Sequence, residues 1–470
     1  MEKTNRPNRH RFLTVAGTSA VAAAVSQPLF GMKAALAAPL VRQDVGSLTA
    51  TSPAILSYAA AITKMQALPV TDPTSWAYQA AIHGTTLSLA LQSWNTCEHN
   101  TEWFWSWHRM YLYWFERIVR KKSGDYGWTL PYWAWDSASE RKLPSMFRIT
   151  TSALYTSHRD PNINNGTGSL PAGDVSTAAA FATPVYSTPS QTGANDIFQG
   201  TPHGNVHVDV GGWMQSIYTA GQDPIFYLHH ANCDRLWQVW RANYGGVDPV
   251  GDSTWTGKTY TFFNENGAPV TMNACQIVNA AQQLNYVYQN GPTLPQEACP
   301  PRKIWCCIPI RWLVPIKFPI IPPLADQPVH IPLPIPEDLL QRVLSMAKNP
   351  SESVYLQLEG VQADRQPGVV WETYLGPSAA MTSNTESPSF VGNVVLFGTG
   401  IREGMPSMFR PAVFAFKINR AILAAAAGGK ILVVTFAPRG ILVNGQLTHP
   451  KVRAPVRIGK MSIVVETLKR

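Results

Sequence analysis

The chain has 470 residues, of which 14% are charged, 16 are Trp and 38 are Pro. This composition argues against intrinsic disorder and against an all-helical bundle, and the length allows two or three domains. The net charge of +9 does not indicate a nucleic-acid partner, because five of the 38 basic residues lie in the first 37 and no long basic cluster remains after them.

Residues 1–37 have the pattern of an export signal. Four basic residues precede a mildly apolar run over 14–32, and Ala35-Leu36-Ala37 supplies a small-x-small cleavage pattern. The run Arg9-His10-Arg11 resembles a twin-arginine motif in which His10 replaces the second arginine. We expect an exported protein, periplasmic or secreted, that is cut near Ala37. An uncleaved anchor is the alternative, and no later segment indicates an integral membrane protein.

Residues 45–290 are predicted to form a mainly α domain with long loops. Asp72-Pro73 opens a helix through His83 towards Leu91, since Asp is a good N-cap and Pro fits the first helical turn. Residues 103–121 are apolar on almost every face, which predicts a buried helix. Asp223-Pro224 opens another helix that extends to about residue 244, and residues 150–200 are predicted to be irregular loops.

A Pro-rich connector is predicted over residues 291–345, followed by a C-terminal β-sandwich over 346–470. The second prediction depends on short β-type runs separated by turn signals such as Gly428-Gly429. These runs are 354–358, 391–397, 413–416, 431–436 and 461–465.

The six cysteines lie at positions 97, 233, 275, 299, 306 and 307, and none forms a CxxC motif. A zinc ribbon or a thioredoxin motif is therefore not indicated. Cys275 and Cys299 could pair in an oxidising compartment. The sequence leaves the pairing among Cys275, Cys299, Cys306 and Cys307 open.

Six histidines fall into two groups of three, and these carry the predicted chemistry. The groups are His83, His99 and His108, and His203, His207 and His230. His203 and His207 are one helical turn apart, so their rings can reach one metal ion. Helices meeting around such a cluster predict a four-helix bundle with a metal site at its centre. All-imidazole ligands suit Cu, Zn, Fe or Ni, and two adjacent sites without a Glu-x-x-His motif favour copper.

The segments around these histidines resemble a known family. They are residues 107–116 (Trp107-His108-Arg109 onward), residues 130–136 (Leu130-Pro131-Tyr132-Trp133-Ala134-Trp135-Asp136), 202–207 and 223–237. They are similar to the signatures of the type 3 (binuclear) copper family, which includes bacterial tyrosinases, polyphenol (catechol) oxidases and hemocyanins. Weaker similarity over residues 413–459 extends to the sandwich that follows the catalytic core in plant and some bacterial members. In related proteins this sandwich covers the copper cleft with one side chain where substrate would lie, so the resemblance implies that 346–470 is a covering domain. A stabilising domain or an oligomer contact is the alternative.

The resemblance implies two copper ions per chain and O₂ as co-substrate. The first copper would bind His83, His99 and His108, and the second His203, His207 and His230. The implied activity is oxidation of o-diphenols, and of some monophenols, to o-quinones. Oxidation of o-aminophenols and hemocyanin-like O₂ binding without turnover are the alternatives. The implied partner is a small phenol, while a homo-oligomer and a copper-delivery protein stay open.

Further residue roles follow from the same resemblance. Cys97 matches the Cys-x-His pattern that some members cross-link to His99 as a thioether, a free buried thiol being the alternative. Gln199 and Gly204 replace a Glu and an Asn that hold a water in strong monophenol hydroxylases. Gln199 could position that water but could not take its proton, which favours diphenols. Ile217 occupies the position that gates access to the copper.

For two residues near the predicted ligands, a structural role is weighed against a functional one. Asp234 lies four residues after His230, where a carboxylate could orient a ligand or form an ion pair with Arg109 or Arg235. His229 is interpreted as a packed core histidine. His158, His330 and His449 lie outside any motif and are expected to be ordinary loop or surface residues.

Overall fold

The computed structural model describes most of the chain after the expected export signal. Residues Pro39–Arg470 form one compact unit. No helix within the described part of the chain is both long and apolar enough to cross a membrane. The described residues are 38–187, 193–294, 310–376, 387–397, 411–427, 432–448 and 451–467.

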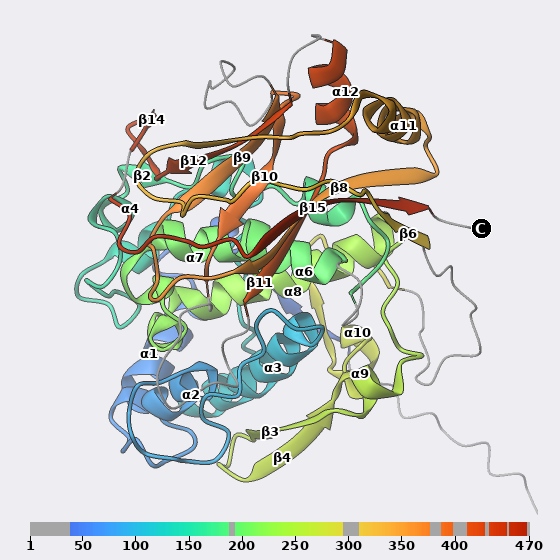
Figure 1. The fold of residues 1–470 in the computed structure, drawn as a ribbon. Coiled ribbons are helices and arrows are strands. Elements are labelled where there is room, and N and C mark those ends of the chain that lie inside the picture. Colours follow the sequence, from blue (N-terminus) through green and yellow to red (C-terminus); the bar gives the residue numbers. More distant parts are fainter. Residues whose placement is uncertain are drawn as a thin grey trace, which may run out of the picture. The chain divides into compact units, whose positions relative to one another are not determined.

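The N-terminal part is a helical core (Figure 1). Its main helices are α1 (Pro53–Gln66), α2 (Trp76–His83), α3 (Phe104–Ser123), α7 (Asn205–Val210) and α8 (Ile225–Asn243). Shorter helices are α4 (Pro161–Asn165), α5 (Ala178–Phe181), α6 (Ala194–Phe198), α9 (Ser253–Gly257) and α10 (Ala280–Gln283). Strand β1 (Leu40–Arg42) pairs in parallel with β5 (Tyr286–Tyr288), and β3 (Thr259–Phe263) pairs with β4 (Pro269–Asn273).

Helix α2 is shorter than the sequence predicts. Its N-cap is Ser75, whose hydroxyl accepts a hydrogen bond from the Tyr78 amide at 3.1 Å. Asp72 instead bonds Thr74 in the preceding turn. The helix ends at His83 and does not reach Leu91, because Gly84 lies against the backbone of Ile217, where a Cβ would be 2.3 Å from the carbonyl oxygen.

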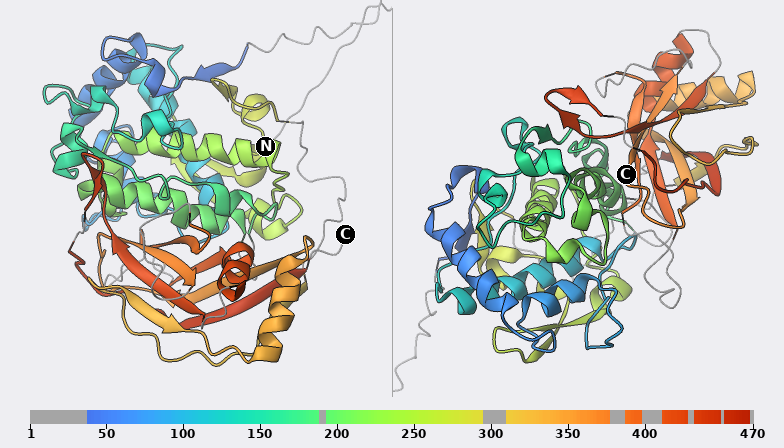
Figure 2. Two further views of the ribbon diagram at one scale, coloured as in Figure 1. Left: turned by 90° about the horizontal axis from the view of Figure 1, so that it is seen from above. Right: turned by 90° about the vertical axis from the view of Figure 1, so that its left-hand side faces the viewer.

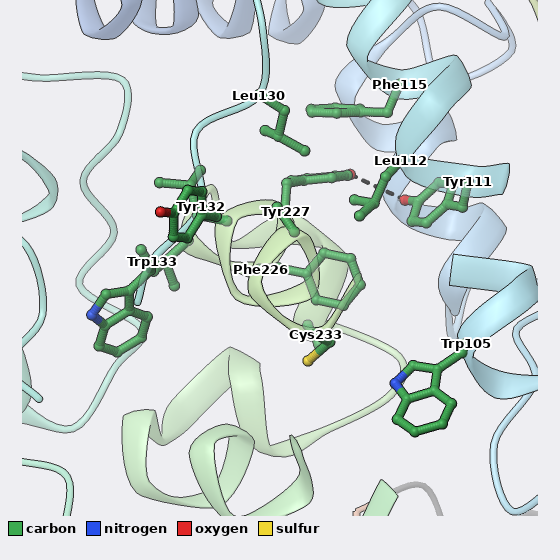
Figure 3. Close-up of a cluster of buried hydrophobic side chains, with 14 of the residues drawn as sticks. Trp105, Tyr111, Leu112, Phe115, Leu130, Tyr132, Trp133, Phe226, Tyr227 and Cys233 are labelled. Atoms are coloured by element: carbon green, nitrogen blue, oxygen red, sulfur yellow. Dashed lines mark hydrogen bonds between the residues drawn. The ribbon is translucent and has the colours of Figure 1, made fainter. Parts of the chain in front are cut away.

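Helix α3 is the buried helix that the sequence predicts, and aromatic packing aligns it with α8, the predicted helix after Asp223-Pro224. Phe115 stacks on Tyr227 with a centroid distance of 3.6 Å, and Trp105 stacks on Trp237 at 5.9 Å. Figure 3 shows Phe115 above Tyr227 and the hydrogen bond between the hydroxyls of Tyr111 and Tyr227, which are 3.1 Å apart. This packing aligns the histidines that the two helices carry.

The C-terminal part consists of two four-stranded antiparallel sheets that share one hydrophobic core. Their strand orders are β10-β9-β12-β7 and β11-β8-β15-β6, with α11 (Glu337–Lys348) and α12 (Asn419–Ala427) beside the strands (Figure 2). The strands are β6 (Ile310–Leu313), β7 (Val329–Pro332), β8 (Glu352–Val361), β9 (Val370–Gly376), β10 (Phe390–Val395), β11 (Ala412–Lys417), β12 (Val433–Arg439) and β15 (Lys460–Thr467).

The sheets begin earlier than the sequence predicts. Strands β6 and β7 and most of α11 lie inside the expected connector 291–345, which therefore contributes one edge strand to each sheet. Prolines in these strands and around them hid the β pattern, and edge strands tolerate Pro. Strand β9 shows no alternation because all seven of its residues are buried.

Direct contacts join the sheets to the helical core. Strand β13 (Leu442–Val443) pairs with β14 (Gln446–Leu447) and with β2 (Gly168–Ser169) of the core. The buried carboxylate of Asp174 accepts hydrogen bonds from Arg439 and from Asn393, the latter at 2.8 Å. Because Asn393 belongs to β10, this contact fixes the strand that leads to the histidines.

Candidate binuclear metal centre

The structure brings the six predicted ligand histidines into two adjacent groups. His83 ends α2, His108 lies in α3 and His99 lies in the loop before α3. His203 and His207 belong to the turn Gln199–Gly204 and to α7, and His230 belongs to α8. Cys97 joins the first group and His229 the second, and within each group the candidate ligand atoms lie within 4.8 Å of one another.

The two groups face each other across α3 and α8. The rings of His108 and His230 are parallel, with an angle of 3° and a centroid distance of 4.1 Å. The rings of His99 and His203 are 5.8 Å apart. The helix pairing therefore places both groups in one buried chamber, as a binuclear centre requires.

Backbone carbonyls orient four of the rings. The Nδ1 atoms of His83 and His207 lie 2.9 and 2.8 Å from the carbonyl oxygens of Ile217 and Met214. Those of His108 and His203 lie 2.8 and 2.9 Å from the carbonyls of Phe104 and Gln199. A proton on Nδ1 leaves the Nε2 lone pair of each ring free towards the chamber.

The donor atoms fit a metal. Nε2 of His83 and Nε2 of His203 are buried and have no hydrogen-bond partner among the described residues, although buried polar atoms are normally paired. Burial lowers the pKa of both rings to about 3, so they are neutral at physiological pH. Neutral imidazoles without a carboxylate ligand are the donor set that copper accepts.

Cys97 lies close to two rings of the first group. Its Sγ is 3.4 Å from Nδ1 and 3.8 Å from Nε2 of His99, the two nitrogens bonded to Cε1. It is also 3.4 Å from Nε2 of His108. Cys97 is a free thiol, and burial raises its pKa. The structure therefore contains the juxtaposition that a thioether needs.

Gln199 connects the second group to the loop that carries His99. Its carbonyl holds His203, its side-chain Oε1 accepts from the Asn100 amide at 2.5 Å, and its Nε2 donates to the Thr101 carbonyl at 3.0 Å. The amide that the sequence assigns to water positioning is thus bonded to the backbone of the His99 loop. Sequence reasoning also missed the Ile217 carbonyl, because only the gating role of that side chain had been considered.

Asp234 forms an ion pair with Arg109, which was one of the two structural alternatives considered for it. Its carboxylate lies 2.5 Å from Nε of Arg109 and 3.3 Å from Nη1 of Arg42, and the hydroxyls of Tyr286 and Tyr288 donate to it at 2.6 Å. Arg235 pairs with Asp136 instead. These contacts stabilise α3, α8 and the β1–β5 pair.

The remaining histidines are consistent with structural roles. His158 stacks on Trp213 with a centroid distance of 4.1 Å, and Nδ1 of His330 lies 2.9 Å from the Thr435 hydroxyl. His449, Cys299, Cys306 and Cys307 lie outside the described residues. Cys275 is disulfide-bonded.

Phe397, which follows β10, covers the second group. Its ring is parallel to that of His207, with a centroid distance of 3.7 Å and an angle of 12°. It also lies 5.3 Å from His99 and 5.5 Å from His203. Gly204 makes room for it, since a Cβ there would be 3.1 Å from Val395 and 3.5 Å from Phe397. The resemblance implied that a side chain of the sandwich covers the cleft, but the sequence did not identify Phe397 as that residue.

Two adjacent groups of buried histidines in a helical core fit a binuclear metal centre. Residues 73–191 and 154–243 match the common central domain of tyrosinase, and residues 250–301 match the polyphenol oxidase middle domain. These matches cover the helical core, and they confirm the resemblance to the type 3 copper tyrosinases and polyphenol oxidases seen in the sequence.

Individual relatives agree with this family. The tyrosinase HcTyr1 of Hahella sp. (strain CCB-MM4) is 35% identical over 298 residues, covering 52% of this chain and 62% of the relative. A chloroplastic polyphenol oxidase of Malus domestica is 26% identical over 390 residues, covering 72% and 65%. The chain thus spans less than two thirds of these curated relatives.

Solved structures show the same fold. A latent aurone synthase (polyphenol oxidase) aligns with a TM-score of 0.65 at 20% identity, covering 92% of this chain and 90% of that one. Latent apple tyrosinase aligns with a TM-score of 0.59 at 21% identity, covering 91% and 98%. These alignments include the C-terminal sheets as well as the helical core.

Proposed function

We propose that the chain is a copper-dependent oxidase that converts o-diphenols to o-quinones with O₂. The observation that carries the proposal is the pair of adjacent, buried and neutral imidazole groups, each with donor nitrogens free towards one chamber. The match to the central domain of tyrosinase supports copper as the metal.

The first copper would be held by His83, His99 and His108, and the second by His203, His207 and His230, within a four-helix bundle of α2, α3, α7 and α8. His229 is assigned to packing, because its Nε2 lies 3.9 Å from the Cys233 thiol and its ring lies 5.7 Å from Trp135.

When bound, the copper pair supplies a two-electron redox couple that reduces O₂ to water while two catechols become two quinones. The protein keeps the six rings in place through backbone carbonyls, and the buried aromatic residues around the chamber exclude bulk water. A catechol entering the chamber must displace Phe397 from the face of His207.

Diphenols are the favoured substrates. Hydroxylation of a monophenol needs a base that removes the phenol proton near the metal. Gln199 cannot accept that proton, and its amide is already bonded to Asn100 and Thr101. Gly204 offers no side chain that could hold a water.

We further propose that the C-terminal sheets keep the enzyme latent. Phe397 stacks where a substrate ring would approach His207, and the buried Asp174–Arg439 ion pair secures the sheets to the core. An enzyme that produces reactive quinones benefits from staying latent until it has been exported, and export of this chain through the signal over 1–37 is part of the proposal.

The contact of Phe397 also supports a second candidate function, a hemocyanin-like O₂ carrier from which substrate is sterically excluded. Steady-state O₂ uptake by the copper-loaded protein with catechol, tyrosine and o-aminophenol, measured side by side, tests both candidates. We expect uptake to be fastest with catechol. Faster uptake with o-aminophenol would change the substrate class, and reversible O₂ binding without oxidation of any of the three would favour the carrier.

A further inference from the structure

A cavity of about 370 Å³ lies between the helical core and the sheets, apart from the histidine chamber. Its core wall includes Ala179 and Ile197, and its sheet wall includes Phe390, Phe414 and Phe416. The volume falls in the range of small-molecule pockets, and three aromatic rings on one wall suit a flat apolar ligand.

Two cations line the same cavity. Lys417 and Arg420 are exposed, and neither forms an ion pair with a carboxylate in the part of the chain that the structure describes. Glu466 interacts electrostatically with Lys417, but its carboxylate forms an ion pair with Arg311 at 2.8 Å. These cations are therefore available to a ligand.

The one carboxylate in the lining does little to offset these cations. Burial raises the pKa of Asp196 to about 7, so this carboxyl carries less negative charge near pH 7 than an ordinary aspartate does. The cavity thus combines an aromatic wall with a net positive charge. An apolar ligand with a single negative charge complements both features.

We propose that this cavity binds a small aromatic carboxylate. The ring would pack between the phenylalanines, and the carboxylate would reach Lys417 and Arg420. The cavity is separate from the copper ligands, so this proposal does not depend on the proposed oxidase activity.

Binding at this cavity is connected to the metal centre through two elements. Strand β10 contributes Phe390 to Asn393 to the wall and leads directly to Phe397, which stacks on His207. Thr201, also in the lining, lies two residues before His203. Because the walls come from both parts of the chain, the ligand site is complete only while the sheets are docked. A ligand that binds only the docked form stabilises that form by mass action.

Isothermal titration calorimetry of the copper-loaded, full-length chain with 2-naphthoate tests the proposal. We expect 1:1 binding and a rise in Tm. The double substitution Lys417→Gln with Arg420→Gln should weaken binding at least tenfold, and Ala179→Phe, which fills the cavity, should abolish it. Lys451→Gln, which removes an exposed charge outside the lining, should leave binding unchanged.

Carboxylates can also bind copper, so the same titration is repeated with copper-free protein. Binding that survives Ala179→Phe, or that disappears when copper is removed, would locate the probe at the metal centre and overturn the proposal. Absence of binding to the native chain at millimolar 2-naphthoate would overturn it as well. If Ala179→Phe does not fold, as judged by circular dichroism, the charge variants decide.

Discussion

The two candidate metal sites are built alike in two of their predicted ligands and differently in the third. In each site, two histidines are oriented by backbone carbonyls, at Ile217 and Phe104 in the first site and at Gln199 and Met214 in the second. The third predicted ligand of the first site, His99, comes from a loop and is contacted by Cys97. The third predicted ligand of the second site, His230, comes from a long helix and stacks on His108.

A cysteine lies beside a histidine in both candidate sites, but the two histidines have different predicted roles. Cys97 faces a predicted ligand, whereas Cys233 faces His229, which is assigned to packing. A loop needs a side-chain partner to fix a ring, while a helix already fixes it through packing. The comparison therefore predicts that modification or loss of the cysteine changes copper retention in the first site and leaves the second site unchanged.

The largest expected effect is the difference in diphenol oxidation between variants of His230 and of its neighbour His229. His230→Ala should reduce diphenol oxidation to background and remove one of two coppers, because the second site loses a ligand. His229→Ala should retain both coppers and mainly lower Tm. Elemental analysis with O₂ uptake measures both. One copper per native chain, zinc after copper loading, or copper loss in the His229 variant would break the assignment.

The second effect concerns the loop ligand. If Cys97 bonds Cε1 of His99, with O₂ as the oxidant, the peptide containing both residues loses two hydrogens in mass spectrometry. Cys97→Ser should then weaken copper retention in the first site roughly 10- to 100-fold, as expected when a partner of a ligand is removed. Cys233→Ser is the matched control and should leave copper retention unchanged. An alkylatable Cys97 in active enzyme would contradict the cross-link.

The third effect concerns Phe397, whose ring lies closer to His207 of the second candidate site than to His99 of the first. Phe397→Ala should raise diphenol oxidation roughly two- to tenfold, since an aromatic contact contributes about 0.5–1.5 kcal/mol. Gly204→Ala should act in the same direction, because its Cβ would push against Val395 and Phe397.

Proteolysis tests the same idea with every side chain intact. Limited cleavage within the expected connector, between residue 291 and the start of β6 at Ile310, should raise diphenol oxidation without changing copper content. Equal or lower activity after clean removal of the sheets, with copper retained, would show that they support the core and do not cover it.

The smallest expected effect is a pH dependence of folding stability that comes from Asp196, near the second candidate site. The pKa of Asp196, on α6 just before the turn that carries His203, is raised by burial from 3.8 to about 7. The folded state therefore binds more protons than the unfolded state between about pH 4 and 7, and stability falls as pH rises through that window. Asp196→Asn should flatten this part of the curve of Tm against pH. An unchanged slope in the variant would assign it to other groups.

Much of the metal centre was predictable because its signals are local. The two histidine groups, the buried helix over 103–121 and the helix after Asp223-Pro224 all follow from short-range patterns, and the structure contains them. The helix ending at His83 was predicted too long, because Gly84 ends it through a contact with Ile217, 133 residues away in sequence.

The parts that were missed depend on long-range contacts. The resemblance implied a covering side chain, but Phe397 itself was predicted only as the end of a strand, because nothing in residues 391–397 marks it as the residue that contacts His207. The side chain of Gln199 looks like a water-positioning group until the loop at Asn100 is placed beside it. Strands β6 and β7 were hidden by prolines, and β9 by its burial on both faces.

Strand β1 has a consequence for the order in which the protein is made. Its Arg42 is fully buried and bonds Glu116 and Asp234, while Leu40 lies opposite Tyr286. The first strand after the expected signal therefore cannot find its partner until about 245 further residues have been synthesised. Contacts of such long sequence separation slow folding and favour completion after release from the ribosome. An export route that accepts finished, metal-loaded proteins would suit this order of events better than one that threads the nascent chain.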